Sequence, residues 1–305
     1  MMRQAVVGID VGGTRIKSAL LSSGGAILGE STSPTPRMLR DVLGQTVREI
    51  VASLVAASSS GGGGAAVAAV GVVVPGLVDD DRGIGVWSAN LGWRDLDLRA
   101  LVEGHLDVPV AIGHDVRAGL LGEHRFGAAR EVADVLFLPL GTGIAGAMLS
   151  QGHLVRGSAW TGEIGHVVVV PDGPACRCGQ RGCLEAISSA AAIGRRWSEA
   201  TGESGDAEHV VRRLNAGDPL AQRIWREAVD ALATVTAPVV AAAGTELVLV
   251  GGGLVRSGEA LLGPFRAQLQ QRLGGRTDVG VSAAALGDRS GSLGAASLAL
   301  DLLSA

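Results

Sequence analysis

Short apolar runs alternate with longer helical patterns along most of the chain. The runs that predict β-strands are Ala5–Asp10, Arg15–Leu21, Ala26–Glu30, Val67–Val74, Val108–Ile112, Val135–Leu140, Ala145–Leu149, Val167–Val170, Glu246–Val250 and Val279–Ala283. The patterns that predict helices are Met38–Ala57, Val116–Phe126, Ser189–Thr201, Ala207–Asn215, Pro219–Ala243, Leu261–Leu273 and Ser292–Leu303. Such alternation is typical of an α/β protein.

The order of these elements repeats once in coarse form. A strand–Gly-Gly–strand meander near Asp10 has a counterpart in the strand–Gly-Thr-Gly–strand near Gly141. We therefore expect two similar α/β halves around a cleft. The smaller domain is expected to comprise residues 1–116 and 291–305, with a returning C-terminal helix, and the larger one residues 117–290. The run SSSGGGG at Ser58–Gly64 predicts a flexible surface loop.

Composition narrows the class of protein. The chain has 305 residues, 47% hydrophobic and 18% charged, so it can bury a large core and is long enough for about two domains. The formal net charge is −4 and no basic block occurs, which argues against nucleic acid or a membrane surface as the main partner. No apolar run reaches transmembrane length, and the chain enters a strand pattern without a signal peptide. These features favour a soluble cytoplasmic protein.

Three glycine loops follow predicted strands and are candidates for binding phosphate. The first, DVGGTRIK at Asp10–Lys17, offers backbone N–H groups, the Thr14 hydroxyl and a carboxylate that suits the water shell of Mg²⁺. It is not a Walker loop, because Ile16 stands where glycine would precede Lys17-Ser18. An ordinary Gly-Gly hairpin is the alternative.

The second and third glycine loops lie further along the chain. GTGIAG at Gly141–Gly146 formally matches GxGxxG, but the AMLSQGHLV that follows predicts strand, turn and strand rather than a helix. We therefore discount a dinucleotide site and favour a second phosphate hairpin, with Thr142 as a hydroxyl donor. Gly251–Gly253 follows a strand at its carboxyl end, where open α/β sheets bind ligands, although a plain helix entry is the alternative.

All three cysteines fall within ten residues of one another, and a histidine precedes the first of them by ten positions. The spacing H-x9-C-x-C-x4-C runs through His166, Cys176, Cys178 and Cys183, and it supplies the four N and S ligands of a structural zinc ion. Three buried thiols with a chance histidine are one alternative, and a disulfide that leaves one thiol unpaired is another.

The motifs together resemble the ROK family (repressor, open reading frame, kinase). They occur in the family's order: DVGGTRIK at Asp10, HDVRAG at His114, GTGIAG at Gly141, GEIGH at Gly162, CRCGQRGCLE at Cys176 and VGGG at Val250. The resemblance implies the actin-like ATPase/sugar-kinase fold, which is ribonuclease H-like. It also implies phosphorylation of a hexose 6-hydroxyl by ATP and Mg²⁺. The motifs are most similar to those of ATP-dependent glucokinases, so glucose is the expected sugar.

The resemblance also implies a role for each matching residue. Asp115 is the expected general base because aspartate is the family's residue at this place; the alternative is an N-cap for a helix that starts near Val116. The residues expected at the sugar are Gly76, Asn90, His114, Asp115, Glu163, His166 and Glu185, with His166 binding zinc through its other ring nitrogen. The residues expected at the nucleotide are Asp10, Gly12, Gly13, Thr14, Lys17, Gly141, Thr142, Gly143, Gly251, Gly252 and Gly253. For Glu163, His166 and Glu185 the alternative is support of the cysteine loop alone.

His114 departs from the family pattern, in which asparagine precedes the aspartate. A neutral imidazole can donate and accept as an amide does, but it is bulkier and titrates near neutrality. Other substrates therefore stay open, namely mannose, fructose, allose, N-acetylglucosamine and N-acetylmannosamine, and so does a non-catalytic sugar-binding regulator. A repressor would need an N-terminal helix-turn-helix, for which the loop at Asp10 leaves no room. The resemblance implies a homodimer, with a tetramer as the alternative.

Overall fold

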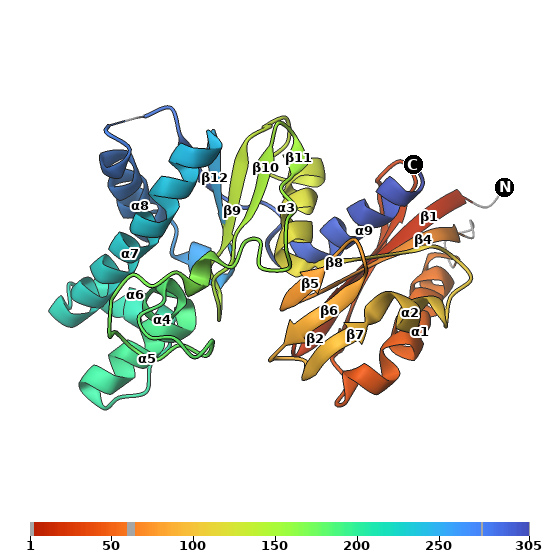
Figure 1. The fold of residues 1–305 in the computed structure, drawn as a ribbon, viewed down its shortest axis with the longest axis horizontal. Helices are drawn as coiled ribbons and strands as arrows, with labels where there is room; N and C mark the ends of the chain where they lie inside the picture. Colours follow the sequence, from red (N-terminus) through yellow and green to blue (C-terminus); the bar gives the residue numbers. More distant parts are fainter. Residues whose placement is uncertain (1–2, 60–64, 276, 305) are drawn as a thin grey trace. The chain divides into compact units, whose positions relative to one another are not determined.

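The computed structural model describes residues 3–59, 65–275 and 277–304. Its contacts divide the chain into two compact units, the first made of Met1–Arg130, Arg156–Trp160 and Asp288–Ala305, the second of Glu131–Val155 and Thr161–Gly287. Each unit has its own five-stranded sheet and its own helices (Figure 1). Most of the loop predicted at Ser58–Gly64 lies outside the described residues.

The first unit is built on a five-stranded sheet of order β3-β2-β1-β4-β8. Its strands are β1 (Arg3–Val11), β2 (Arg15–Ser22), β3 (Ile27–Pro34), β4 (Ala65–Val74) and β8 (Val110–His114). The first three form the expected antiparallel meander, whereas β1, β4 and β8 run parallel. The carboxyl ends of those three strands therefore share one edge of the sheet.

Helices cover both faces of this sheet. Helix α1 (Leu39–Ser59) packs its apolar residues into a core with the alternating side chains of β1. Helix α9 (Ser290–Leu302) packs on β1, β4 and β8 from the other face, so the last elements of the chain lie beside the first (Figure 1). Gly71 makes this close approach possible, because a Cβ there would collide with the backbone carbonyl of Ala295.

Helix α3 (Asp115–Phe126) packs on α9 and belongs to the first unit. The contact is so close that a Cβ at Gly294 would collide with the carbonyl of Ala118. From the sequence we expected the smaller domain to end at residue 116. In the structure the first compact unit continues to Arg130, because α3 packs on α9, which is part of the same unit.

A small second sheet follows β4 and was not foreseen from the sequence. It has the order β5-β6-β7, formed by β5 (Leu77–Asp79), β6 (Ile84–Ser88) and β7 (Trp93–Asp97), and leads into α2 (Leu98–Glu103). These strands are short, and charged residues occur within β7, so they carry no clear alternation of apolar and polar side chains. Asp97 caps α2 by accepting a hydrogen bond from the N–H of Ala100 at 2.9 Å.

The second unit repeats the sheet of the first with the order β11-β10-β9-β12-β13. Its strands are β9 (Val135–Pro139), β10 (Ala147–Ser150), β11 (His153–Leu154), β12 (Leu247–Gly251) and β13 (Gly280–Ala283). Again a meander continues into parallel strands, here β9, β12 and β13. The prediction of two similar α/β halves is therefore confirmed.

The helices of the second unit share one large apolar core with this sheet. They are α4 (Leu184–Ser188), α5 (Ala190–Thr201), α6 (Ala207–Asn215), α7 (Pro219–Ala243) and α8 (Glu259–Arg272). Asp218 accepts hydrogen bonds from the N–H groups of Leu220 and Ala221 and starts α7, and Gly244 ends it in the left-handed conformation. None of the helices among the described residues is both long and apolar enough to cross a membrane.

Two predictions of local structure need correction. The run Val167–Val170 is not a strand: only Val168 forms an isolated bridge, to Cys183, and the N–H groups of Val169 and Val170 both donate to the carbonyl of Gly182. The segment therefore follows the cysteine loop instead of joining a sheet. Strand β8 ends at His114 rather than Ile112, and α3 begins at Asp115 with His114, not Asp115, as its N-cap.

Candidate functional site

Asp10 and the first glycine loop lie at the carboxyl edge of the first sheet. The register pairs Asp10 with Val73, and Val73 with Gly113, so Asp10 stands two strands from the end of β8. Two strand spacings amount to about 10 Å. Burial raises the pKa of Asp10 to about 6, with Lys17 acting to lower it and Asp288 to raise it. A cation bound beside Asp10 would therefore stabilise its ionised form, which burial disfavours.

Two more of the predicted residues lie around this edge. The Cβ of Asn90 lies 3.9 Å from the position that a Cβ would take at Gly13, which places Asn90 beside the glycine loop. Gly76 follows β4 with φ at 111°, and a Cβ there would collide with the carbonyl of Trp87. The turn after β4 is thus held closely against the end of β6.

His114 and Asp115 form the junction of β8 and α3. The N–H of Val116 donates to Nδ1 of His114 at 3.2 Å and to Oδ1 of Asp115 at 2.8 Å. Burial, and then the positive charge of Arg117, lower the pKa of His114 to about 3. Because Nδ1 accepts, the neutral ring carries its proton on Nε2, which lies 3.4 Å from Oδ1 of Asp115. His114 therefore presents an uncharged N–H donor beside Asp115.

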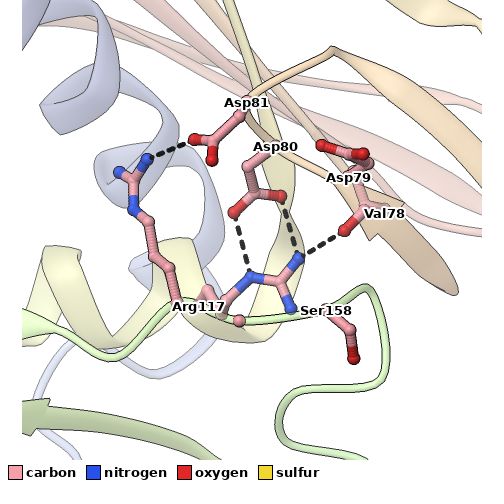
Figure 2. Close-up of a pocket in the computed structure, with 8 residues that line it drawn as sticks. Val78, Asp79, Asp80, Asp81, Arg117 and Ser158 are labelled. Carbon is pink, nitrogen blue, oxygen red and sulfur yellow. Dashed lines mark hydrogen bonds and ion pairs between the residues drawn. The ribbon is translucent and has the colours of Figure 1, made fainter.

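Sequence reasoning missed an ion pair behind this junction. Arg117 donates from Nε to Oδ2 of Asp80 at 2.9 Å and from Nη2 to Oδ1 at 2.8 Å (Figure 2). The same Asp80 Oδ1 accepts a hydrogen bond from the backbone N–H of His114 at 3.1 Å. The only signals in the sequence were the run Asp79–Asp81 and an arginine two residues after Asp115, and each of them is as common on a solvated surface.

The glycine loops of the second unit lie side by side at the corresponding edge. The N–H of Leu140 donates to the carbonyl of Gly251 at 2.9 Å, and the N–H of Leu254 donates to the carbonyl of Leu140 at 3.0 Å. Gly252 has a positive φ, and a Cβ there would collide with the backbone of Leu140. The hairpin that contains Gly141, Thr142 and Gly143 is therefore packed directly against the Gly251–Gly253 loop.

Glu185 and the Gly162–His166 segment contact the same hairpin. Oε2 of Glu185 accepts a hydrogen bond from the N–H of Ile144 at 3.0 Å. The N–H of Gly146 donates to the carbonyl of Gly162 at 2.7 Å, which ties the segment to the hairpin. The second unit thus brings together its predicted sugar residues and its predicted phosphate loops.

The cysteines and His166 form one cluster of donor atoms. Nδ1 of His166 lies 3.6 Å from Sγ of Cys176, and the sulfurs of Cys178 and Cys183 lie 3.7 Å apart. All four donor atoms lie within 4.8 Å of one another. Zinc–sulfur bonds of about 2.3 Å in a tetrahedron place ligand atoms about 3.8 Å apart, so the cluster fits a zinc ion.

The second ring nitrogen of His166 faces away from the sulfurs. Its Nε2 lies 3.6 Å from Oε2 of Glu163, three residues earlier. Burial is the main reason that the pKa of Cys183 is raised to about 12, and hydrogen bonds with the neighbouring thiols add to it. A coordinated cation would lower this pKa, because a metal-bound thiol is deprotonated. A metal bound here would hold His166 toward Glu163 through the arrangement common to metal-bound histidines.

The two sheets, each a three-stranded meander extended by parallel strands, define the class of actin-like ATPases and sugar kinases. The ROK family model matches residues 6–302. A glucokinase of Thermotoga maritima is 35% identical over 286 residues, which are 88% of each chain. An N-acetylmannosamine kinase of Escherichia fergusonii is 31% identical over 85% of this chain and 87% of its own. The protein belongs to the ROK family.

A solved structure extends this likeness over nearly the whole chain. It is that of a ROK family glucokinase from Streptomyces griseus in complex with glucose and AMPPNP. Its sequence identity is 31% and its TM-score 0.79, and the match covers 97% of this chain and 99% of that one. The expected fold class is confirmed.

Proposed function

We propose that the protein transfers the γ-phosphoryl group of ATP to the 6-hydroxyl of a hexose, with glucose as the principal substrate. The observation that carries this proposal is the register of the first sheet, which supports an acidic cation site at Asp10 and a catalytic carboxylate at Asp115 on one edge. The likeness to glucokinases, including one in complex with glucose and AMPPNP, supports the same chemistry.

In the first unit, Asp115 is the proposed general base. Its carboxylate accepts the proton of the 6-hydroxyl while that oxygen attacks the γ-phosphorus, and ADP leaves with the electron pair of the broken P–O bond. His114, with its neutral Nε2–H, Gly76 and Asn90 are proposed to contact the sugar. Gly12, Gly13, Thr14 and Lys17 are proposed to contact phosphate.

Asp10 is the proposed anchor for Mg²⁺. When bound with ATP, the cation neutralises charge that develops on the phosphates during transfer. The raised pKa of Asp10 agrees with this role, because a carboxylate that is costly to ionise alone gains most from a neighbouring cation.

In the second unit, Glu163, His166 and Glu185 are proposed to hydrogen-bond sugar hydroxyls. Gly141, Thr142, Gly143 and Gly251–Gly253 are proposed to contact the nucleotide through backbone N–H groups and the Thr142 hydroxyl. Cys176, Cys178, Cys183 and Nδ1 of His166 are proposed to hold a structural zinc ion, whose role is to orient the His166 ring. We also propose a cytoplasmic homodimer.

A second candidate substrate is an N-acetylhexosamine such as N-acetylmannosamine. The observation that favours it is His114, which stands where the family pattern has asparagine and which is buried and neutral in the structure. A similar chain is an N-acetylmannosamine kinase. The larger imidazole changes the shape available to the sugar, so this candidate is tested beside glucose.

The test is an ADP-release assay with magnesium-ATP and a panel of hexoses and N-acetylhexosamines. We expect the highest kcat/KM with glucose. A higher value with an N-acetylhexosamine would replace glucose as the substrate and make His114→Asn the next variant. Sugar-dependent ADP release that is absent across the whole panel, from protein with its full zinc content, would overturn the proposed kinase.

A further inference from the structure

The Asp80–Arg117 pair links two stretches of the first unit that are predicted to contact sugar. Asp80 lies just after β5, four residues beyond Gly76, and Arg117 lies in the first turn of α3 after His114 and Asp115. Besides its two bonds to Asp80, Arg117 donates from Nη2 to the carbonyl of Val78 at 2.9 Å (Figure 2). The pair therefore fixes the β5 segment and the start of α3 relative to each other.

Both side chains are largely withdrawn from water. The side chain of Arg117 is 6% exposed and that of Asp80 is 13% exposed. Burying an ion pair has a desolvation cost that a well-packed apolar pair does not have, so stability alone is a weak reason for its presence. The bidentate geometry instead defines the orientation of both groups.

The Asp80–Arg117 pair contacts the junction of β8 and α3 through a hydrogen bond to the backbone of His114. Asp80 Oδ1 accepts from the N–H of His114, and a carboxylate is also favourable at the N-terminus of a helix. With that peptide held, the His114 ring lies with Nδ1 toward the N–H of Val116 and Nε2 toward Asp115. Asp80 thus holds the backbone of the residue whose ring Nδ1 accepts from the N–H of Val116, an arrangement that leaves the proton on Nε2.

We propose that Asp80 and Arg117 are positioning residues for the phosphoryl transfer, because they hold the start of α3 so that His114 presents Nε2–H beside the carboxylate of Asp115. The inference rests on the proposed function. Neither residue is proposed to touch sugar or nucleotide.

Two double variants separate positioning from a merely structural role. Asp80→Ala with Arg117→Leu removes the pair without stranding a buried charge, so the chain is expected to fold. We expect kcat to fall about a hundredfold, since misplacement of reacting groups by about 1 Å has an effect of that size, while the KM for ATP stays unchanged. Asp80→Asn with Arg117→Gln keeps neutral hydrogen bonds, and we expect it to recover most of that loss.

The matched control is Asp81→Asn. Asp81 is the neighbour of Asp80 in the chain and pairs with Arg156 at 3.2 Å. The carboxylate that binds the Arg117 guanidinium is that of Asp80 (Figure 2). We expect its kcat to equal that of the wild type. Wild-type kcat in the apolar double variant, or an equal loss in Asp81→Asn, would overturn the proposed positioning.

A readout without catalysis distinguishes failure of this inference from failure of the proposed function. The ¹⁵N NMR signals of the His114 ring report which nitrogen carries the proton, and a His114→Asn spectrum identifies them among the six histidines. We expect the Nε2–H form in the wild type and a mixture of tautomers in the apolar double variant. If both proteins give the same ring signals, the positioning is overturned even when the kinase is active. If they differ while no sugar is phosphorylated, only the proposed function fails.

Discussion

The two five-stranded sheets have the same strand arrangement, and both carry glycine loops at their carboxyl edges, but they differ in the side chains at the ends of their strands. The edge of the first sheet carries ionisable side chains: Asp10 near the end of β1, His114 as the last residue of β8, and Asp115 as the first residue of α3. The strands of the second sheet end without ionisable residues, and its edge carries two glycine loops, the hairpin at Gly141–Gly143 packed against the loop at Gly251–Gly253. One topology thus supports two kinds of site.

The difference agrees with the proposed division of roles, in which the first edge supplies the base and the cation site and the glycine loops contact phosphate. Carboxylates can move a proton and hold a cation, and both tasks depend on a tuned charge. Backbone N–H groups in glycine loops approach phosphate closely and carry no charge that needs compensation. The second unit also holds, outside its sheet, the cluster of His166 and three cysteines that is the proposed zinc site.

The largest expected effect is at the carboxylate edge. Asp115→Asn keeps the size of the side chain and an oxygen for the N–H of Val116, but it removes the base. We expect kcat to fall about 10²–10⁴-fold with little change in sugar affinity, as measured by ADP release and by sugar titration. Asp107→Asn, an exposed position before β8, is the control. If Asp115→Asn retained its turnover, Asp115 would not be the general base.

Metal removal tests the second unit. We expect one zinc ion per chain by elemental analysis, and its loss in His166→Asn. A ligand at 1,000 times its Kd that binds only the folded state contributes about 4 kcal/mol, so the free energy of unfolding should fall by roughly that amount. His153→Asn changes an exposed histidine on the hairpin of the same unit and should keep both metal and stability. Protein that neither contains zinc nor gains stability when zinc is added would contradict the proposed site.

The smallest expected effect is on the pH dependence of the free energy of unfolding of metal-free protein, to which Asp10 and His114 at the edge of the first sheet both contribute. The raised pKa of Asp10 means that the folded state holds a proton that the unfolded state has lost, so this contribution to stability falls as pH rises from about 4 to 6. The lowered pKa of His114 has the opposite sign, because its contribution is full above pH 6.5 and is lost as pH falls toward 3.

Because the two contributions oppose each other, single variants should separate them. On acidification from pH 6.5 to 4, we expect Asp10→Asn to lose stability relative to wild type and His114→Asn to gain it, each by about 1–3 kcal/mol. Urea unfolding at several pH values measures both. The cluster of His166 and three cysteines is the same in each protein, so its own pH dependence cancels in the difference. If the free energy of unfolding changed with pH equally in both variants and in wild type, the pKa values of Asp10 and His114 would not be shifted as described.

Several features were predicted correctly because local patterns carry them. The helix Pro219–Ala243 was placed at its observed bounds, since Asp218 and Gly244 mark its ends. The cluster of His166 with Cys176, Cys178 and Cys183 follows from spacing alone, because short loops keep such donors together. Val167–Val170 was wrongly predicted as a strand, since hydrophobic composition does not reveal whether a partner strand is available.

The sequence by itself determined the α/β class, the duplicated meander, the glycine loops and the cluster of donor atoms. Each of these is specified by residues close together along the chain. Only the tertiary structure decided that α3 packs on α9, that Asn90 lies beside Gly13, and that Asp80 holds the N–H of His114 across 34 positions. The reason is physical: hydrogen bonds and burial depend on which segments meet, and that follows from the packing of whole elements rather than from local periodicity.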